Sequence, residues 1–582
     1  MKIKELIIWG MASMSLASCH SLDLQPLTQA STGNWFSDET QLDMSLNTLY
    51  MHRFWPMFKN DFYVNGSNLS LMALDEATDD WTNRTTLIPF TNGALTGDNV
   101  TFLKQMWSYS YKAVSRCNTI LENMHRAADK MSFEKYKRYE AEALFVRACQ
   151  YARLVSYWGD VVYFTKDLDL DEAYKLGRTG KDEVMKVIYA DFDTAAKYLP
   201  VSYTSGEVQR ATKGAAYAMK ARAALFNKDY EIALKAAQDC MELGVYQLYP
   251  DFGELFMSKT KNSVETVFGI PRSTKYGTSL EGGAVTAYLS RNITSPSCTA
   301  TPSWDLLCAF LCTDGKTIDK SPLYDPRNPF KNRDPRCSYT IVEFNTRYFD
   351  YNYTVHPDSS KCYNYKTGTL VANKDSKAGD QYASYNGLIL RKGIDEDWGD
   401  DLKADNDKLI VRYADVLLMY AEAKIELNRI DASVLEAMNK VRARAYKKDW
   451  NSEGYPRITT TDQTELRRLL RIERRMEFAF EGLRYADIIR WRIAEKVMNY
   501  YNYGIPTSLA DCKTLVHNNY WFFGGTPEID EDGCPDFTKM DHIDLYRKLS
   551  KRVFDPGKHY LWPLPTDDLT VNPNLLPNNP NY

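Results

Sequence analysis

Residues 409–491 carry the clearest helical periodicity in the chain. Apolar residues recur at the spacing of one helix face in residues 414–425, and again in residues 434–445. Asn428 and Asp431 lie between these stripes, where a turn and a new N-cap are expected. Two short amphipathic helices joined by a tight turn cannot bury their apolar faces alone, so they pack on each other and then on a neighbour. The stretch therefore predicts stacked helical hairpins.

A second hairpin in the same stretch carries an unusual density of charge. Glu473, Glu477 and Glu481 are spaced one per helical turn ahead of Gly482, which we expect to end the helix. Two carboxylates on one face are also the acid–base pair of a glycoside hydrolase. The neighbouring arginines would hold these carboxylates ionised, whereas a general acid needs a raised pKa. We therefore interpret the cluster as a structural ion-pair network between helices. Its members are Glu473, Arg474, Glu477, Glu481, Arg484 and Asp487.

Helical periodicity also runs through residues 103–243. Apolar stripes pair residues 103–124 with 134–158 and residues 181–199 with 210–226, and small residues are dense in the last of these segments. Such pairs are similar to tetratricopeptide hairpins, which stack into a curved solenoid. We predict a mainly α fold, a tetratricopeptide-like superhelix of helical hairpins, with a loop-rich insert and small β elements.

The helical signal fades in residues 249–407, where short β-like runs and clustered tyrosines replace it. An insert of this length without helices is unusual in a compact domain unless it serves binding. Helical pairs are expected again in residues 409–500, and prolines in residues 555–582 predict an extended C-terminal strap. We expect residues 19–582 to form a single domain.

The N-terminus has the pattern of a bacterial lipoprotein signal. Two lysines precede an apolar run at residues 6–16, which is too short to span a bilayer. The sequence Leu-Ala-Ser-Cys at residues 16–19 resembles a lipobox, in which the thiol is lipidated and the chain is cut before it. We therefore expect a signal peptide at residues 1–18 and a mature chain tethered by acyl chains at Cys19. The alternative is an ordinary cleaved signal followed by a chance cysteine.

Composition and charge exclude several classes of function. The formal net charge of the 582-residue chain is −4 and no basic block occurs, so we expect no nucleic-acid partner. With 7 histidines and no Cys-x-x-Cys pair, the sequence has no zinc pattern. Acidic runs at residues 395–407 and 530–533 lack the order of a calcium loop. We predict no cofactor and no metal, with a structural calcium ion as the open alternative.

Short motifs follow one another in a fixed order along the whole chain. They comprise Trp107 and Tyr111; residues 142–148 with Gly159-Asp160-Val161; Asp334-Pro335-Arg336; Arg412-Tyr413-Ala414-Asp415 with Ala421-Glu422-Ala423; Glu473, Arg474, Glu477, Glu481, Gly482 and Arg484; and Pro563-Leu564-Pro565 with Asn572-Pro573. Their joint order resembles the SusD/RagB family of outer-membrane nutrient-binding lipoproteins. Val162 and Pro577 depart from the family pattern, both at turns and away from any chemistry.

The resemblance implies a function as well as a fold. Members of this family are non-enzymatic lipoproteins on the outer face of the outer membrane, and they bind glycan, or peptide in some RagB-like members. Their partner is a SusC-like TonB-dependent transporter, over which they sit as a lid. For this chain the resemblance implies a lipid anchor as the only membrane attachment, a glycan ligand and structural motif carboxylates.

Aromatic and polar residues in loops are the candidate ligand contacts. The chain holds 40 tyrosines and 12 tryptophans, and sugar sites combine ring faces with hydrogen-bonding groups. By position the candidates are Trp81, Asn83, Arg84, Tyr276, Tyr288 and Trp304. The alternative is that these rings pack inward, and Trp304 lies in a stretch that looks like family framework. Two other functions stay open: a secreted glycan hydrolase that uses Glu473 or Glu477, and a scaffold that only supports a porin.

Overall fold

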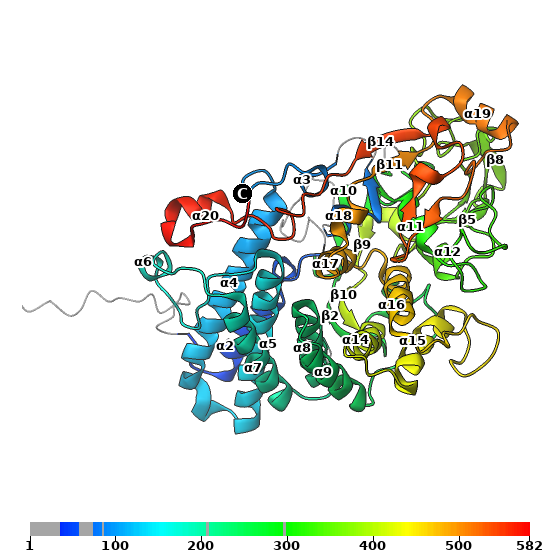
Figure 1. The fold of residues 1–582 in the computed structure, drawn as a ribbon. Helices are drawn as coiled ribbons and strands as arrows, with labels where there is room; N and C mark the ends of the chain where they lie inside the picture. Colours follow the sequence, from blue (N-terminus) through cyan, green and yellow to red (C-terminus); the bar gives the residue numbers. More distant parts are fainter. Residues whose placement is uncertain (1–34, 58–73, 84–86, 205–208, 295–297) are drawn as a thin grey trace, which may run out of the picture.

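The computed structural model describes residues 35–57, 74–83, 87–204, 209–294 and 298–582. The predicted signal peptide, Cys19 and Arg84 lie outside these ranges. Within them the fold is mainly helical, as the sequence predicts, and no helix is long and apolar enough to cross a membrane. Figure 1 shows helices on one side of the molecule and a loop-rich lobe with small strands on the other.

Paired helices form the first half of the scaffold (Figure 1, blue to teal). Helix α4 packs against α5, α5 against α7, and α8 against α9. Small residues let α8 approach its neighbours closely, because Ala215, Ala218 and Ala221 are fully buried. Ser132 and Thr212 cap α5 and α8 by accepting backbone hydrogen bonds. The helices are α2 (Glu39–Asn47), α4 (Thr101–Asn123), α5 (Phe133–Trp158), α7 (Lys181–Tyr198), α8 (Lys213–Asn227) and α9 (Tyr230–Glu242).

The second half of the scaffold contains the two hairpins predicted from residues 409–491. Helix α14 packs against α9, α15 and α16 and so joins the two halves. The predicted turn is confirmed, because Asn428 has a positive φ of 53° and the Asp431 carboxylate caps α15. The helices are α14 (Tyr413–Glu426), α15 (Ala432–Ala445), α16 (Gln463–Phe478) and α17 (Arg484–Arg490).

The end of α16 differs from the prediction. The helix stops at Phe478, because the next residue is extended and Phe480 has a positive φ of 60°. Lys392 donates from its Nζ to two carbonyl groups at this end, at 3.0 and 2.9 Å, which satisfies acceptors that the helix leaves open. Glu481 therefore lies beyond the helix instead of on its next turn, and Gly482 does not cap it.

Small antiparallel strands organise the insert and the segment after α17. Strands β5 to β8 form a four-stranded sheet, and the others pair as β1 with β4, β2 with β10, β3 with β9, β11 with β14 and β12 with β13. Their bounds are β1 (Trp81–Asn83), β2 (Thr266–Ile270), β3 (Leu280–Glu281), β4 (Ala300–Pro302), β5 (Thr346–Tyr348), β6 (Tyr351–Tyr353), β7 (Lys361–Asn364), β8 (Thr369–Ala372), β9 (Lys403–Ala404), β10 (Lys408–Arg412), β11 (Tyr501–Gly504), β12 (Glu528–Ile529), β13 (Pro535–Asp536) and β14 (Arg547–Lys551).

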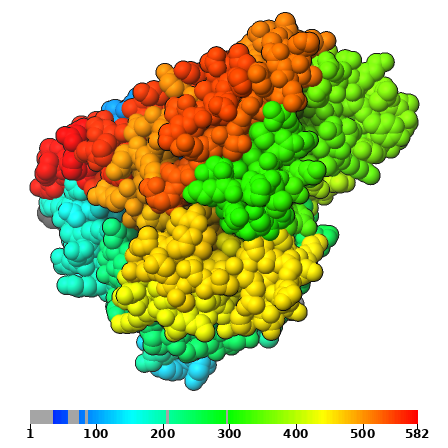
Figure 2. Space-filling model, turned by 45° about the vertical axis from the view of Figure 1, so that its right-hand side comes forward, coloured from blue at the N-terminus to red at the C-terminus, as the bar shows by residue number. Residues whose placement is uncertain are grey.

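Short helices fill the connections of both lobes. They are α3 (Pro89–Asn92), α6 (Leu170–Ala173), α10 (Gly283–Thr286), α11 (Trp304–Ala309), α12 (Arg336–Thr340), α13 (Trp398–Asp401), α18 (Ala494–Val497), α19 (Leu509–His517) and α20 (Thr566–Val571). In the space-filling view the green insert and the orange segment beside it lie above the yellow surface that includes α15 (Figure 2).

Two large hydrophobic cores meet at α16. Leu466 and Leu470 belong to the core of the helical scaffold, whereas Ile472 and Met476 belong to the core of the insert. The helix therefore contributes side chains to both cores, and its last residue, Phe478, belongs again to the core of the scaffold. This shared wall fixes the insert relative to the scaffold.

The C-terminal strap crosses the first helices (Figure 1, red). The Trp562 ring stacks on Tyr157 with centroids 4.4 Å apart, and the Nε1 of Trp158 donates to the carbonyl of Pro563 at 2.9 Å. The strap is less extended than predicted, because α20 forms one short helix directly after Pro565.

Candidate functional site

A buried ion-pair network joins α16 to the elements around it. Glu477 is fully buried and accepts hydrogen bonds from Arg412 at 2.6 Å, from Arg336 at 3.0 Å and from Arg444. Burial alone would raise the pKa of Glu477, but Arg444, Arg412 and Arg336 outweigh it and hold this pKa well below its usual range. Glu473 is equally buried and lies 2.7 Å from both Arg336 and Arg442.

The other members of the predicted network extend it to α14, to α17 and to the segment that holds Asp79. Arg474 pairs with Asp415 at 2.8 Å and with Asp487 at 3.0 Å. Arg484 pairs with Asp79 at 2.8 Å. Because arginine side chains enclose Glu473 and Glu477 on the inside of the protein, neither carboxylate can reach a glycosidic bond. The geometry therefore matches a structural role and disfavours the acid–base pair of a hydrolase.

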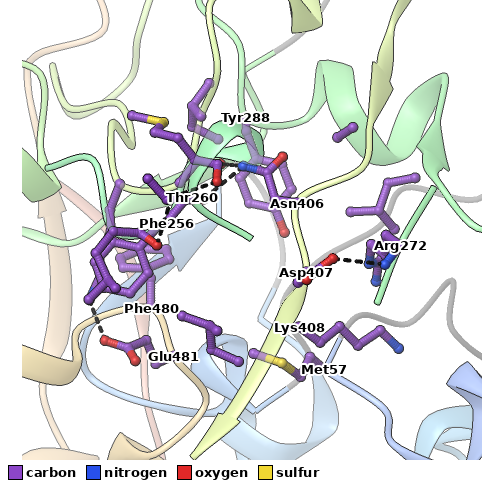
Figure 3. Close-up of a pocket in the computed structure, with 18 of the residues that line it drawn as sticks. Met57, Phe256, Thr260, Arg272, Tyr288, Asn406, Asp407, Lys408, Phe480 and Glu481 are labelled. Carbon is purple, nitrogen blue, oxygen red and sulfur yellow. Dashed lines mark hydrogen bonds and ion pairs between the residues drawn. The ribbon is translucent and has the colours of Figure 1, made fainter. Parts of the chain in front are cut away.

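A cavity of about 100 Å³ lies above this network, between the scaffold and the insert (Figure 3). We call it the interlobe cavity. Apolar side chains form most of its wall, and charged and amide groups lie among them. The lining residues are Met57, Leu255, Phe256, Met257, Thr260, Lys261, Arg272, Leu280, Tyr288, Leu390, Lys392, Gly393, Ile394, Trp398, Ala404, Asn406, Asp407, Lys408, Leu409, Phe480 and Glu481.

Two polar residues just before β10 are fixed in the cavity wall. The amide of Asn406 donates to the carbonyl of Phe256 and to the carboxylate of Asp395, both at 2.8 Å. The carboxylate of Asp407 accepts from the backbone N–H of Arg272 at 3.1 Å, and burial raises the pKa of Asp407 (Figure 3). These groups are held rigidly, which is the state required to orient a ligand.

Lys392 connects the cavity to the network. Its Nζ lies 2.6 Å from the carboxylate of Glu481 and 4.4 Å from the centre of the Phe256 ring. Burial lowers the pKa of Lys392 to about 8, although Glu481 acts in the opposite direction.

One predicted ligand contact lines this cavity, and two others lie next to its lining residues, one in space and one in sequence. Tyr288 lines it, and Trp81 packs behind Tyr288 and Phe480 with ring centroids 6.3 and 5.3 Å apart. Both predicted rings are only 2% exposed, so they support the wall and offer no open face. Tyr276 is 75% exposed and lies on the short loop between two lining residues, Arg272 and Leu280. It is therefore the predicted ring with a face accessible from solvent.

The remaining candidates lie apart from the cavity or cannot be placed. Trp304 is 1% exposed in α11, its Nε1 donates to the carbonyl of Asn386, and aromatic rings surround it, which does not fit a ligand platform. The N-cap at Ser303 turns the first residue of α11 into the insert core. The backbone of Asn83 pairs in β1, while Arg84 lies outside the described residues.

Sequence reasoning missed Phe256, Arg272, Asn406 and Asp407. In the sequence, the acidic run at residues 395–407 stands out only as an incomplete calcium loop, yet its last two residues line the cavity. The sequence signal that could have located Asn406 and Asp407 is their position as a polar pair directly before strand β10.

The second weak calcium motif is closed by a lysine. The ammonium of Lys496 lies 2.9 Å from Asp530, 2.7 Å from Glu531 and 2.9 Å from Asp532. Across the described ranges, no group of three or more His, Cys, Asp or Glu side chains is arranged to hold a metal ion.

Comparison with known proteins places this architecture among related chains. A model described as the SusD family matches residues 265–582, and a model described as starch-binding associating with outer membrane matches residues 23–225. SusD-like protein P25 of Formosa agariphila is 24% identical over 527 residues, 85% of this chain and 90% of that protein.

Solved structures share the fold over nearly the whole length. A crystal structure of a SusD-like carbohydrate-binding protein from Bacteroides fragilis is 29% identical, covers 93% of this chain and 99% of that one, and has a TM-score of 0.75. Surface glycan-binding protein A from Bacteroides fluxus is 19% identical with a TM-score of 0.60, covering 94% of this chain and 100% of that one, which shows likeness of fold.

Proposed function

Because this chain belongs to the SusD family, we propose that it is a glycan-binding lipoprotein of the outer membrane, without catalytic activity. Lipid attachment at Cys19 would hold it on the cell exterior. There it would deliver oligo- or polysaccharide to a SusC-like TonB-dependent transporter. The carbohydrate-binding relative from Bacteroides fragilis and the outer-membrane description of the second family model support this proposal.

The observation that carries the proposal is the exposed Tyr276 ring, on the loop between two residues that line the interlobe cavity, Arg272 and Leu280. Pyranose rings pack their C–H faces on tyrosine. Side-chain amides donate hydrogen bonds to the sugar hydroxyl groups and accept from them, whereas carboxylates accept from them. The cavity of about 100 Å³ is smaller than the roughly 300–1,000 Å³ that encloses a drug-sized ligand. It would therefore hold one end of a glycan, while the rest lies across the Tyr276 loop.

Calorimetry of the mature protein against a panel of neutral oligosaccharides tests glycan binding. We expect at least one glycan to bind, and Tyr276→Ala to weaken that binding. The matched control is Tyr174→Ala, which removes a ring that is 46% exposed beside α6, away from the cavity. Binding that is unaffected by Tyr276→Ala would move the site elsewhere, and no binding to any glycan would overturn the proposal.

Three further measurements test the absence of catalysis, the partner and the lipid anchor. Chromatography of the glycan after incubation should show no new product, whereas product release would favour the hydrolase. Affinity purification from solubilised outer membranes should recover a TonB-dependent transporter with the full-length protein. A Cys19→Ala variant should leave the membrane fraction.

A further inference from the structure

A second and larger depression lies on the helical scaffold, away from the interlobe cavity. Its volume is about 740 Å³, within the roughly 300–1,000 Å³ of ligand pockets. The start of α14, the second half of α15 and the segments at residues 246–251 and 447–450 form it, at the yellow side of the molecule in Figure 1. We call it the α15 groove. No residue that the structure describes lines both depressions.

Basic side chains outnumber acidic ones in the lining of the α15 groove, although the net charge of the chain is −4. Four cationic side chains and two carboxylates line it within the described part of the chain. One cation, Arg444, is buried and committed to Glu265 and Glu477. The three lysines face outward, and they are Lys440, Lys447 and Lys448.

The lysines are available to a ligand. Lys447 pairs with Asp251 at 2.7 Å and Lys440 with Glu436 at 2.6 Å, but both lysines are partly or largely exposed, so these pairs contribute little and exchange readily. Among the described residues, Lys448 has no carboxylate within ion-pair distance. An anionic ligand therefore meets three ammonium groups without breaking a buried pair.

Aromatic rings line the α15 groove together with these charges. The rings of Tyr246 and Tyr413 are 6.3 Å apart at 31°, and Trp450 lies partly exposed beside Lys448 and Lys447 in the chain. Rings of this kind pack on the C–H faces of sugars, whereas ammonium groups bind carboxylate or sulfate oxygens as charge-assisted hydrogen bonds. A groove lined by both aromatic rings and cations fits an oligosaccharide whose sugar rings carry anionic groups.

We propose that the α15 groove binds an anionic oligosaccharide, held by Lys440, Lys447 and Lys448 through its carboxylate or sulfate groups. The sugar faces lie on Tyr246, Tyr413 and Trp450. This site is separate from the interlobe cavity, so the protein holds one glycan at two places or selects charged glycans over neutral ones.

Calorimetry of the mature protein with three oligosaccharides of equal length tests the inference. The probes are an oligogalacturonate, a chondroitin sulfate oligosaccharide and a neutral malto-oligosaccharide. We expect at least one anionic probe to bind more tightly than the neutral one, with an affinity that falls as sodium chloride rises through the range where surface charges are screened. Because both anionic probes carry carboxylates, binding of the chondroitin sulfate oligosaccharide alone identifies sulfate as the recognised group.

Variants then assign the binding to the groove. Lys447→Gln/Lys448→Gln should lower the affinity for the anionic probe by about tenfold, which corresponds to the loss of two exposed ionic contacts. The control Lys361→Gln/Lys366→Gln removes the same charge at the β7–β8 hairpin and should leave the affinity for the anionic probe unchanged. Trp450→Ala should also lower the affinity for the anionic probe. Its melting temperature checks that the variant is folded.

The inference is overturned by failure of both anionic probes to bind, by binding that Lys447→Gln/Lys448→Gln leaves unchanged, or by an equal effect of the control. Tyr276→Ala should leave the affinity for the anionic probe unchanged. A loss of affinity as large as that of Lys447→Gln/Lys448→Gln would assign the binding to the interlobe cavity. If the anionic glycans bind and the neutral glycans do not, the groove is supported while the neutral-glycan binding proposed for the interlobe cavity is not.

Discussion

The ammonium of Lys392 lies 2.6 Å from the carboxylate of Glu481, at the point where the insert meets the helical scaffold. Lys392 comes from the insert and Glu481 from the segment after α16. Arg412 of β10 also binds Glu481, at 2.7 Å. Through this carboxylate the floor of the interlobe cavity is tied to the ion-pair network, so the position of the cavity depends on this buried network.

Lys392→Met should destabilise the protein by about 3–5 kcal/mol, because removing one partner leaves the other charge buried without compensation. The variant also leaves two carbonyl groups at the end of α16 without a donor. Urea unfolding measures the change. Lys361→Met at an exposed position is the control, and we expect it to change stability by less than about 0.5 kcal/mol. An effect of Lys392→Met as small as the control would contradict the assigned role.

Glu477→Gln should also cost about 3–5 kcal/mol of unfolding free energy, because three arginines lose their shared carboxylate. An exposed pair gives the contrast: Glu254 and Lys259 lie 2.6 Å apart with 47% and 62% of their side chains exposed. Glu254→Gln should stay within about 1 kcal/mol of the wild type, as exposed ion pairs do. If both variants unfold at the same urea concentration, the network is not a stability element.

Tyr276→Ala and Trp304→Ala should separate binding from folding. Tyr276 is exposed, so its loss should lower glycan affinity and leave the melting temperature unchanged. Trp304 is 1% exposed among aromatic rings, so its loss should cost about 3–5 kcal/mol of stability. Calorimetry and thermal unfolding on the same preparations measure both. A stable Trp304→Ala protein with lost binding would restore Trp304 as a ligand contact.

Local patterns predicted the helical hairpins, whereas long-range contacts decided what the sequence could not predict. The α14–α15 turn follows from Asn428 and Asp431, which act within their own segment. The end of α16 depends on Lys392, 85 residues away from Glu477 in the chain. The small strands are equally non-local, since Trp81 pairs with Pro302. A strand of two to five residues is too short for its sequence pattern to reveal such a distant partner.

The candidate site shows the same division. Tyr276 stays a prediction that rests on its loop and its ring, both of which are visible in the sequence. Phe256, Asn406 and Arg272 come from three segments that meet only when β2 pairs with β10 and the intervening chain folds over them. Their chemistry was readable, but their proximity was not.

The stability of Asp75→Asn should differ from that of the wild type in a pH-dependent way. Asp75 is fully buried in a segment that contacts Gly482, and its Oδ2 accepts from that backbone N–H at 2.9 Å. Burial, and then the neighbouring carboxylate of Asp80, raise the pKa of Asp75 to about 8. The folded protein therefore keeps a proton that the unfolded chain releases above about pH 4.

The contribution of this carboxyl group is full below about pH 4 and is lost as the pH rises towards 8, because the unfolded state binds fewer protons in that range. Asparagine keeps the acceptor for Gly482 and has no proton to lose. The unfolding free energy of Asp75→Asn relative to wild type should therefore rise by more than about 2 kcal/mol between pH 4 and pH 8. Urea titrations at four pH values measure this difference, with Asp171→Asn on the exposed α6 as the control. Parallel curves for Asp75→Asn and wild type would show that Asp75 is ionised in the folded protein.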